Sequence, residues 1–211
     1  MSQPIVSITI NHGADHIISA LGASMKQVDQ ARVSSAVKVR QWLNTQLVRE
    51  IARAADISPR GIKGRFKQSF TRTGREIMAS IWIGVNPLEA HKIGRPSQNN
   101  TGVRVRGHVF DGAFKARIYT ATEKVFIRMT SKHYDSEKYP SEQKRPGDRF
   151  SPRYKKDHSP LRNSGRFPVV KIRIPIAEQM EEILPEYEGP AARKFEEIFE
   201  HELKFAMGWF K

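Results

Sequence analysis

Residues 71–85 read TRTGREIMASIWIGV, and the spacing of the apolar side chains changes at Gly74 within this stretch. Before Gly74 the apolar residues recur mostly every three, four or seven positions, as they do on one face of a helix. After it, residues 76–85 have the period of two that is typical of a half-buried strand. The sequence therefore predicts a helical N-terminal part followed by a part that is rich in strands.

A long amphipathic helix is predicted over residues 24–55, on the N-terminal side of this change. Its apolar stripe consists of Ala36, Leu43, Leu47, Ile51 and Ala54. Basic side chains occupy its other faces, so the helix is expected to present a positively charged exterior.

A second helix, short and basic, is predicted to begin at Pro59. Ser58 can cap it, and Pro59 suits the first helical position, where the missing N–H costs nothing. The basic residues assigned to it are Arg60, Lys63, Arg65 and Lys67. The run from Thr71 to Gly74 ends the helical pattern.

Several further segments have the alternation and the β-branched residues of strands. They lie at residues 5–10, 102–110, 115–120, 124–129 and 167–176. Together they favour an antiparallel sheet. Two polar segments interrupt it, at residues 94–102 and 131–165. The second is rich in Lys, Arg, Ser and Pro and is expected to be an arm that reaches beyond its own subunit, or else a solvated insertion.

The C-terminal part predicts another amphipathic helix, which begins at Gly189-Pro190. Its apolar stripe consists of Ala192, Phe195, Phe199, Leu203 and Ala206. Residues 178–202 carry nine Glu and two basic residues, whereas residues 32–75 carry eleven basic residues and two acids. These opposite charges either attract neighbouring copies head to tail, which can close a ring, or neutralise each other within one subunit.

Length and composition limit the fold and the partners. The 211 residues, 38% of them apolar, suit one domain over residues 1–211 with the arm as an insertion. The predicted class is α+β, in which the long helix and the C-terminal helix pack on an antiparallel sheet. The net charge of +14 favours polyanions or acidic protein surfaces as partners. The absence of Cys excludes disulfides, thiolate zinc sites and thiol nucleophiles. No segment approaches the ~20 apolar residues of a membrane span, so we expect a soluble, unexported chain without a membrane partner.

Motifs for catalysis or metal binding are sparse. His12 and His16 are four residues apart, but the turn residues around them disfavour a helix that could place both on one metal. Glu142 and Lys144 have the spacing of some metal-dependent nucleases, with Asp111 as a second carboxylate, but they lie in the polar segment. The sequence therefore predicts no metal, no cofactor and no enzyme. The remaining histidines, which stand alone and are interpreted as surface or satisfied residues, are His91, His108, His133, His158 and His201.

Residues 102–118, GVRVRGHVFDGAFKARI, alternate apolar and basic side chains up to a turn and then reach Gly112-Ala113-Phe114. A twisted hairpin is predicted here. Its basic residues are Arg104, Arg106, Lys115 and Arg117. They are expected to face acidic protein or DNA, or alternatively to form a solvated face whose charge protects the strand edge from aggregation.

The order of these parts resembles the minor tail protein Z family of long-tailed bacteriophages, from about Val28 to Phe205. The shared order is a long helix, a short basic helix opened by SPRGIKGRF, a strand region, a basic hairpin, a strand and a terminal amphipathic helix. The N-terminal strand and residues 131–165 depart from the family pattern, so nothing is carried over to them. The most specific anchors are Gly112-Ala113-Phe114 and Val169-Val170-Lys171-Ile172 followed by Ile174-Pro175.

The resemblance implies a virion protein without catalysis at the head-proximal end of the tail. There it would complete the tail and enable joining to the head connector. The implied partners are the tail terminator, the tail tube, the connector and further copies of the chain in a ring of six. DNA contact would be of the phosphate type and independent of sequence. The alternatives are a sequence-independent nucleic-acid-binding protein and, less favoured, a metal-dependent nuclease. The predicted interface residues are Arg104, Arg106, Gly112, Ala113, Phe114, Lys115, Arg117, Phe195, Phe199 and Leu203.

Overall fold

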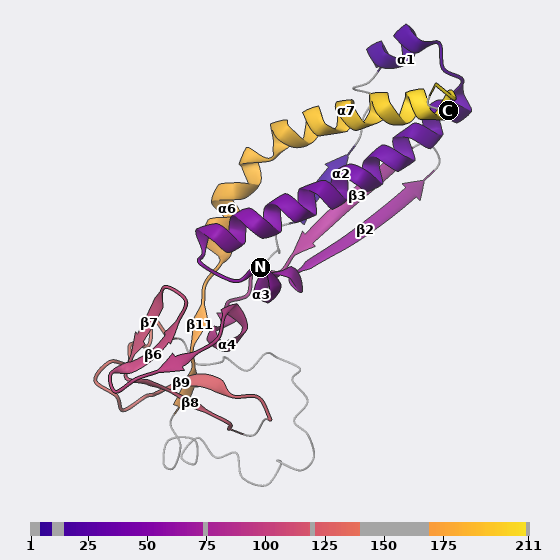
Figure 1. Cartoon of the computed structure of the whole chain (residues 1–211). Coiled ribbons are helices and arrows are strands. Elements are labelled where there is room, and N and C mark those ends of the chain that lie inside the picture. Colours follow the sequence, from indigo (N-terminus) through magenta and orange to yellow (C-terminus); the bar gives the residue numbers. More distant parts are fainter. Residues whose placement is uncertain (1–4, 10–14, 74–75, 119–120, 140–168, 210–211) are drawn as a thin grey trace. The chain divides into compact units, whose positions relative to one another are not determined.

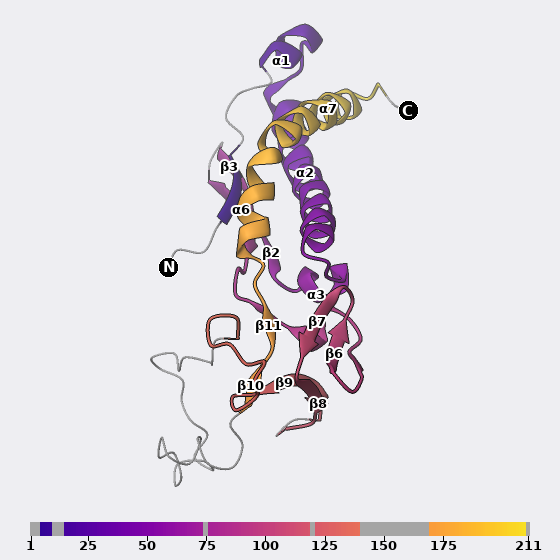
Figure 2. The ribbon, with the colours of Figure 1, turned by 90° about the vertical axis from the view of Figure 1, so that its left-hand side faces the viewer.

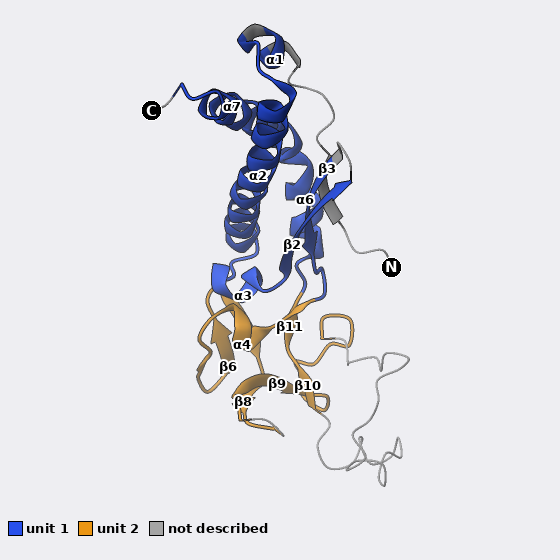
Figure 3. Ribbon diagram, turned by 90° about the vertical axis from the view of Figure 1, so that its right-hand side faces the viewer, with its two compact units in different colours: residues 1–86, 175–211 blue, residues 87–174 orange. Residues whose placement is uncertain are grey.

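The computed structural model describes residues 5–9, 15–73, 76–118, 121–139 and 169–209. The chain divides into two compact units, which are coloured separately in Figure 3. Unit 1 comprises residues 1–86 and 175–211, and unit 2 comprises residues 87–174. The assignment of all 211 residues to one domain stays a prediction. Within the described part of the chain, no helix combines the length and apolarity that crossing a membrane requires.

Helix α2 (Met25–Ala54) is the longest element of unit 1 and confirms the helix predicted over residues 24–55. Ser24 caps it: its hydroxyl accepts a hydrogen bond from the Gln27 backbone N–H, and the Gln27 side chain accepts one from the Ser24 N–H. No Gly or Pro interrupts residues 25–54. The capping box and an uninterrupted run of helix-compatible residues therefore explain the start and the length of α2.

The C-terminal end of α2 is closed by backbone hydrogen bonds. Asp56 has a φ of 45°, in the left-handed region. Its N–H donates to the Arg53 carbonyl, and the Ile57 N–H donates to the Ala52 carbonyl at 2.8 Å. This is the Schellman pattern, and the buried Ile57 side chain supplies the apolar contact that accompanies it.

Two helices at the C-terminus pack along α2. Helix α6 (Ala177–Glu186) and helix α7 (Glu188–Ala206) both contact it, and Figures 1 and 2 show the three helices lying together. Short helix α1 (Asp15–Leu21) packs Ile17, Ile18 and Leu21 against the same region. The C-terminal helix was predicted, whereas α1 and α6 were not. The core between α2 and α7 contains Val28, Ala31, Val39, Phe195, Phe199 and Leu203.

A three-stranded antiparallel sheet covers another side of α2, which lies between α7 and the strands in Figure 1. Its order is β1 (Ile5–Thr9), β3 (Glu76–Ile83) and β2 (Phe66–Thr73). Ile77 and Ala79 of β3 pack on Ala36 of α2. Alternate residues of β3 are buried, as the period of two after Gly74 predicted. The α+β class is thus confirmed.

The short basic helix exists but ends earlier than predicted. Helix α3 (Pro59–Lys63) begins at Pro59, and the Ser58 hydroxyl accepts a hydrogen bond from the Gly61 N–H at 3.2 Å. Lys67, assigned to this helix from the sequence, lies in β2 instead. The reason is tertiary pairing, because residues 66–73 match β3 residue by residue over their whole length.

The described residues of unit 2 form short antiparallel strands and one helical turn, α4 (Ala90–Ile93). β5 (Ser97–Gln98), β6 (Gly102–Val105) and β7 (His108–Asp111) form one sheet. β8 (Ala113–Ala116), β9 (Lys124–Arg128) and β10 (Val169–Lys171) form a second. β4 (Leu88–Glu89) pairs with β11 (Arg173–Ile174), and α4 (Ala90–Ile93) follows β4. Each predicted strand segment overlaps a strand of the structure, but β8 ends at Ala116, before the end of the predicted residues 115–120. The strands form several small ladders instead of one sheet.

The predicted arm falls mostly outside the described residues. Residues 131–139 are described and form turns, and Tyr139 at their end is buried. Residues 140–165 lie outside the description, together with Glu142 and Lys144. The reach of the arm beyond its own subunit stays a prediction.

Candidate basic interface

The positive charge of the chain is concentrated in the sequence of unit 2. Residues 87–174 contain 20 Lys and Arg against 8 Asp and Glu, whereas the remaining residues contain 16 against 14. An excess of this size raises the local concentration of polyanions or acidic surfaces and speeds their association. Unit 2 is therefore the candidate interface.

Arg104 and Arg106 lie in the β6–β7 hairpin, as predicted. Arg104 is exposed between the buried Val103 and Val105, and its Nε donates to the Arg106 carbonyl oxygen at 3.0 Å. Arg106 has a φ of 55° in the two-residue turn. Its side-chain stem packs over Gly94, where an added Cβ would lie 2.9 Å from Arg106 Cγ. The hairpin thus presents two exposed arginines on a defined backbone.

Gly112, Ala113 and Phe114 set the backbone and the packing where β7 is followed by β8. Gly112 has a φ of +70°, and a Cβ there would lie 2.8 Å from Ser131 Oγ. Glycine is the residue that tolerates both constraints. Ala113 is buried opposite Ile127, and Phe114 packs on Phe126 with a ring-centroid distance of 6.1 Å. The three residues therefore have local structural roles, and their predicted contact with a partner stays a prediction.

Lys115 and Arg117 do not share the hairpin of Arg104 and Arg106. The chain leaves the β6–β7 ladder at Gly112, and Lys115 lies in β8, which pairs with β9. Lys115 Nζ lies 3.4 Å from Glu123 Oε2, and Arg117 is exposed after β8. The expectation of one hairpin with four basic residues is thus corrected, because the left-handed Gly112 redirects the chain into a second ladder.

A cluster of cationic side chains surrounds Glu89 at the end of β4. Oε2 of Glu89 lies 3.5 Å from His91 Nδ1, 3.9 Å from Lys92 Nζ and 3.6 Å from Lys124 Nζ. Oε1 lies 4.0 Å from Lys171 Nζ. Residues from β4, α4, β9 and β10 meet here. The sequence did not indicate this cluster, because its members are separated by up to 82 positions and follow no motif.

The cluster shifts the protonation of its two weakly ionising groups. Burial alone would raise the pKa of Glu89, but the attraction of Lys124, Lys92, His91 and Lys171 outweighs it and lowers that pKa. Burial also lowers the pKa of His91, and the three lysines add to this effect against the opposing Glu89. At neutral pH the cluster therefore combines an ionised carboxylate, a neutral imidazole and three ammonium groups.

The lowered pKa of His91 predicts a stability change on mild acidification. A folded-state pKa below the unfolded value of about 6.5 means that the unfolded chain binds a proton more readily. The contribution of His91 is then present above about pH 6.5 and is lost as the pH falls through the folded pKa. His91→Gln should flatten the fall in unfolding free energy between pH 7.5 and pH 5, measured by denaturant titration. An equally steep fall in the variant would contradict this assignment.

The apolar residues of the C-terminal stripe are core residues and not an exposed surface. Phe199 and Leu203 have no exposed area and Phe195 is 8% exposed, all within the packing of α7 on α2. The predicted stripe began at Ala192, but in the structure Ala191 is buried and Ala192 is exposed. Phe195, Phe199 and Leu203 were predicted to contact a partner, but within this chain they are buried and present no exposed surface for such a contact.

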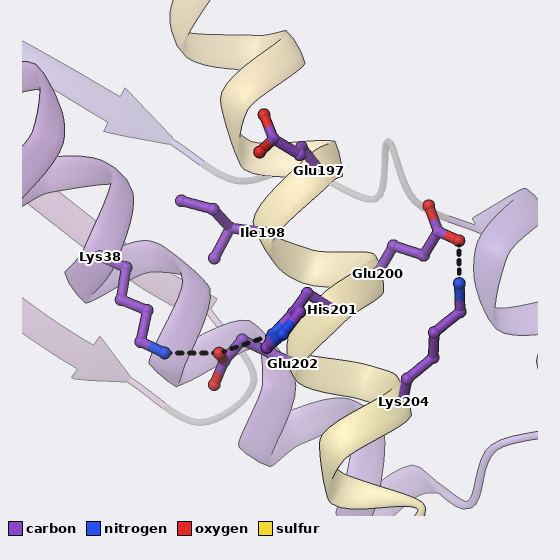
Figure 4. Close-up of a pocket in the computed structure, with 7 residues that line it drawn as sticks. All are labelled: Lys38, Glu197, Ile198, Glu200, His201, Glu202 and Lys204. Atoms are coloured by element: carbon purple, nitrogen blue, oxygen red, sulfur yellow. Dashed lines mark hydrogen bonds and ion pairs between the residues drawn. The ribbon is translucent and has the colours of Figure 1, made fainter. Parts of the chain in front are cut away.

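The basic and acidic helices meet within one chain. Lys38 Nζ of α2 lies 2.6 Å from Oε1 of the largely buried Glu202 of α7. Figure 4 shows this pair among the residues that line a hollow. The hollow has a volume of about 380 Å³ and is lined by Lys38 and residues of α7. Lys204 pairs with Glu200 on the same helix. Lys38 and Glu202 thus pair the basic and the acidic segment at one point within a subunit, and the predicted head-to-tail attraction between copies stays a prediction.

The described residues contain no group of three or more His, Asp or Glu side chains that could hold a metal ion. Asp111 is exposed at the end of β7, and Glu142, its suggested partner in a nuclease site, lies outside the described residues. His16 lies in α1, whereas His12 is outside the description. The nuclease alternative thus gains no support from the part of the chain described.

Comparison of the chain with family models, with curated proteins and with solved structures found no match. The resemblance to the minor tail protein Z family therefore remains a prediction from the sequence.

Proposed function

We propose that this chain is a structural protein of a bacteriophage tail, which completes the head-proximal end of the tail and enables its joining to the head connector. The order of helices, basic hairpin and strands supports the proposal through its resemblance to tail-completion proteins. The observation that carries it is the division of the chain into unit 1, whose charge is nearly balanced, and unit 2, which is strongly basic. Such a division is compatible with a protein that works by binding other proteins through its basic unit and not by catalysis.

In this role the chain acts without catalysis. Unit 1 supplies the packed core, and the arginines of the β6–β7 hairpin contact an acidic surface of the tail terminator, tail tube or connector. Complementary charge fixes the orientation and the rate of docking more than it raises affinity. Copies of the chain assemble as a ring, most simply of six, at the neck of the virion. The closed symmetry of such a ring lets every copy make the same contacts.

The proposal is tested with a phage that lacks this gene. We expect its lysates to contain filled heads and separate tails, and purified wild-type chain added to such lysates should restore joined particles seen by electron microscopy. Joined, infectious particles in the absence of the chain would refute the proposed role.

A second function, sequence-independent binding of nucleic acid, is favoured by the same concentration of charge in unit 2. It predicts binding of duplex by the isolated chain with a steep dependence on salt. It also predicts that loss of the gene leaves head–tail joining intact. The joining experiment therefore distinguishes the two functions.

A further inference from the structure

The sheet of unit 1 has one face that α2 covers and an outer face on which no other described helix packs to a comparable extent. The buried Ile77 and Ala79 of β3 pack on the α2 side. Neighbouring residues of a strand point to opposite faces, so the residues between these lie on the outer face. Across β2 and β3, the outer face consists of Lys67, Ser69, Thr71, Met78, Ser80 and Trp82.

This outer face is open to solvent and partly apolar. Met78 is 47% exposed, and the Trp82 side chain is partly exposed. Lys67 Nζ lies over the indole of Trp82, 5.3 Å from the ring centroid. A Cβ added at Gly84 would lie 3.1 Å from Trp82 Cη2, so the ring also packs close to the backbone. A tryptophan that is fixed on its own chain and still reaches the surface is a typical anchor of a protein interface.

Positive side chains adjoin the outer face where α3 leads into β2. This basic edge consists of Arg60 and Lys63 of α3 and Lys67 of β2, which are all exposed. None of the three has an ion pair among the described residues. The Gly84 N–H donates to the Arg65 carbonyl at 3.0 Å, which ties the edge to the end of β3 next to Trp82. A partner for this region therefore needs negative charge and an apolar contact.

Helix α6 carries a surface with these properties. Its acidic stripe consists of Glu178, Glu181, Glu182 and Glu186, which are exposed and lie three or four positions apart on one side of the helix. Within the described part of the chain, none of the four has an ion pair. Pro185 is exposed on the same side. Like charges at these spacings destabilise a helix, so the stripe would be stabilised by cations from outside.

We propose that the outer face and the basic edge bind the acidic stripe of α6 from a second copy of the chain. This inference rests on the ring of copies in the proposed function and names the two surfaces that meet in it. Both surfaces belong to unit 1, so every copy presents one of each. Because the two surfaces differ, the contact is heterologous, and it continues from copy to copy until the ring closes.

The two surfaces favour a second copy over nucleic acid as the partner. The stripe offers carboxylates and the basic edge offers cations, so one contact between copies neutralises both. Nucleic acid would neutralise the basic edge alone. Pro185 can contact Trp82 or Met78, which gives the outer face an apolar partner. Lys67 lies over the indole and thereby obstructs the stacking of a base on that side of the ring.

The test exchanges the charges of the two surfaces in the full chain. Lys63→Glu with Lys67→Glu reverses the basic edge, and Glu182→Lys with Glu186→Lys reverses the acidic stripe. The second pair places cations in the last turns of α6, where the helix dipole favours them. Sedimentation velocity at low salt, over a series of protein concentrations, measures association. Circular dichroism verifies that each variant is folded.

Wild type should associate increasingly with concentration, and each reversal should weaken association by about a hundredfold or more, because like charges then face each other. An equimolar mixture of the two reversed variants should associate again. In the mixture the unchanged surfaces meet each other, and the reversed surfaces are complementary. The control is Lys26→Glu with Arg49→Glu, which makes the same change of charge as the basic-edge variant at exposed positions elsewhere in unit 1. It should associate as wild type does.

Glu182→Gln with Glu186→Gln separates docking from stability. It removes like-charge repulsion and two carboxylates near the negative end of the helix dipole, so the variant should melt no lower than wild type. It should nevertheless associate about tenfold more weakly, because two of the attractive charges are gone. A lower melting temperature with unchanged association would assign these glutamates to the stability of unit 1 and overturn the proposal.

Three further results would overturn it: a wild type that stays monomeric at every concentration, folded reversed variants that associate as wild type does, and a mixture that stays monomeric. Loss of binding to a labelled duplex in Lys63→Glu with Lys67→Glu, with association unchanged, would assign the basic edge to nucleic acid instead. These measurements use purified chain, so their failure leaves the head–tail joining experiment unaffected. Joined particles without the gene would refute the proposed function even where copies associate.

Discussion

Phe199→Ala is expected to lower the free energy of unfolding by about 3–5 kcal/mol, the cost of deleting a fully buried phenyl ring. Phe199 has no exposed area and packs in the core between α2 and α7. Its ring lies 5.7 Å from that of Phe195, centroid to centroid. Few atoms can move into the space that the ring would leave, because α2 is also held by the sheet on another side. Denaturant unfolding followed by circular dichroism at the helix band measures the change.

Phe205→Ala is the matched control, since Phe205 lies on the same helix and is 57% exposed. Its removal should change stability by no more than about 0.5 kcal/mol. The two variants thus separate a core role from a surface role of the C-terminal stripe. Equal and small effects of both substitutions would contradict the packing of α7 on α2.

The elements that the sequence predicted well are those with local signals. Ser24 with Gln27, and Ser58 with Pro59, mark helix starts through contacts within four residues, and both starts are confirmed. The change of period at Gly74 likewise reflects side chains on a single strand. These signals come from residues close together in the chain, so each can be recognised from its own segment of sequence.

The errors arise where distant parts decide the structure. The extension of the second helix to Lys67 was wrong because β2 gains its hydrogen bonds from β3. Helix α1 was missed because its apolar residues find their partners in the core between α2 and α7. Neither contact has a signature within the segment itself. Propensity is a weak guide in such segments, since tertiary pairing overrides it.

In the candidate site, too, the sequence predicted the feature with a local signal and missed those that depend on distant residues. Alternation along residues 102–110 predicted the hairpin of Arg104 and Arg106. The separation of Lys115 from that hairpin depends on the left-handed conformation of Gly112. The cluster at Glu89 requires β4, β9 and β10 to meet, which only the folded chain reveals.

Reversal of the hairpin charges is expected to have the largest effect on function. Arg104→Glu with Arg106→Glu places two negative charges where the proposed partner surface is acidic, and like charges in contact cost several kcal/mol. Both arginines are exposed, so the variant should fold. The substitution keeps a non-glycine residue at the left-handed position 106. We therefore expect a subunit that melts within about 2 °C of wild type, as surface substitutions usually do, but docks poorly.

Lys26→Glu with Arg49→Glu is the matched control, because it makes the same change of charge at exposed positions of unit 1. It should fold and should join heads to tails as the wild type does. A general effect of net charge would impair both double variants alike.

The most direct measurement counts joined particles when each variant chain is added to lysates of a phage that lacks the gene. We expect Arg104→Glu with Arg106→Glu to yield at least roughly tenfold fewer joined particles than wild type, while the control variant yields normal numbers. Normal numbers of infectious particles from the hairpin variant would contradict the claim that the chain binds its partner through Arg104 and Arg106.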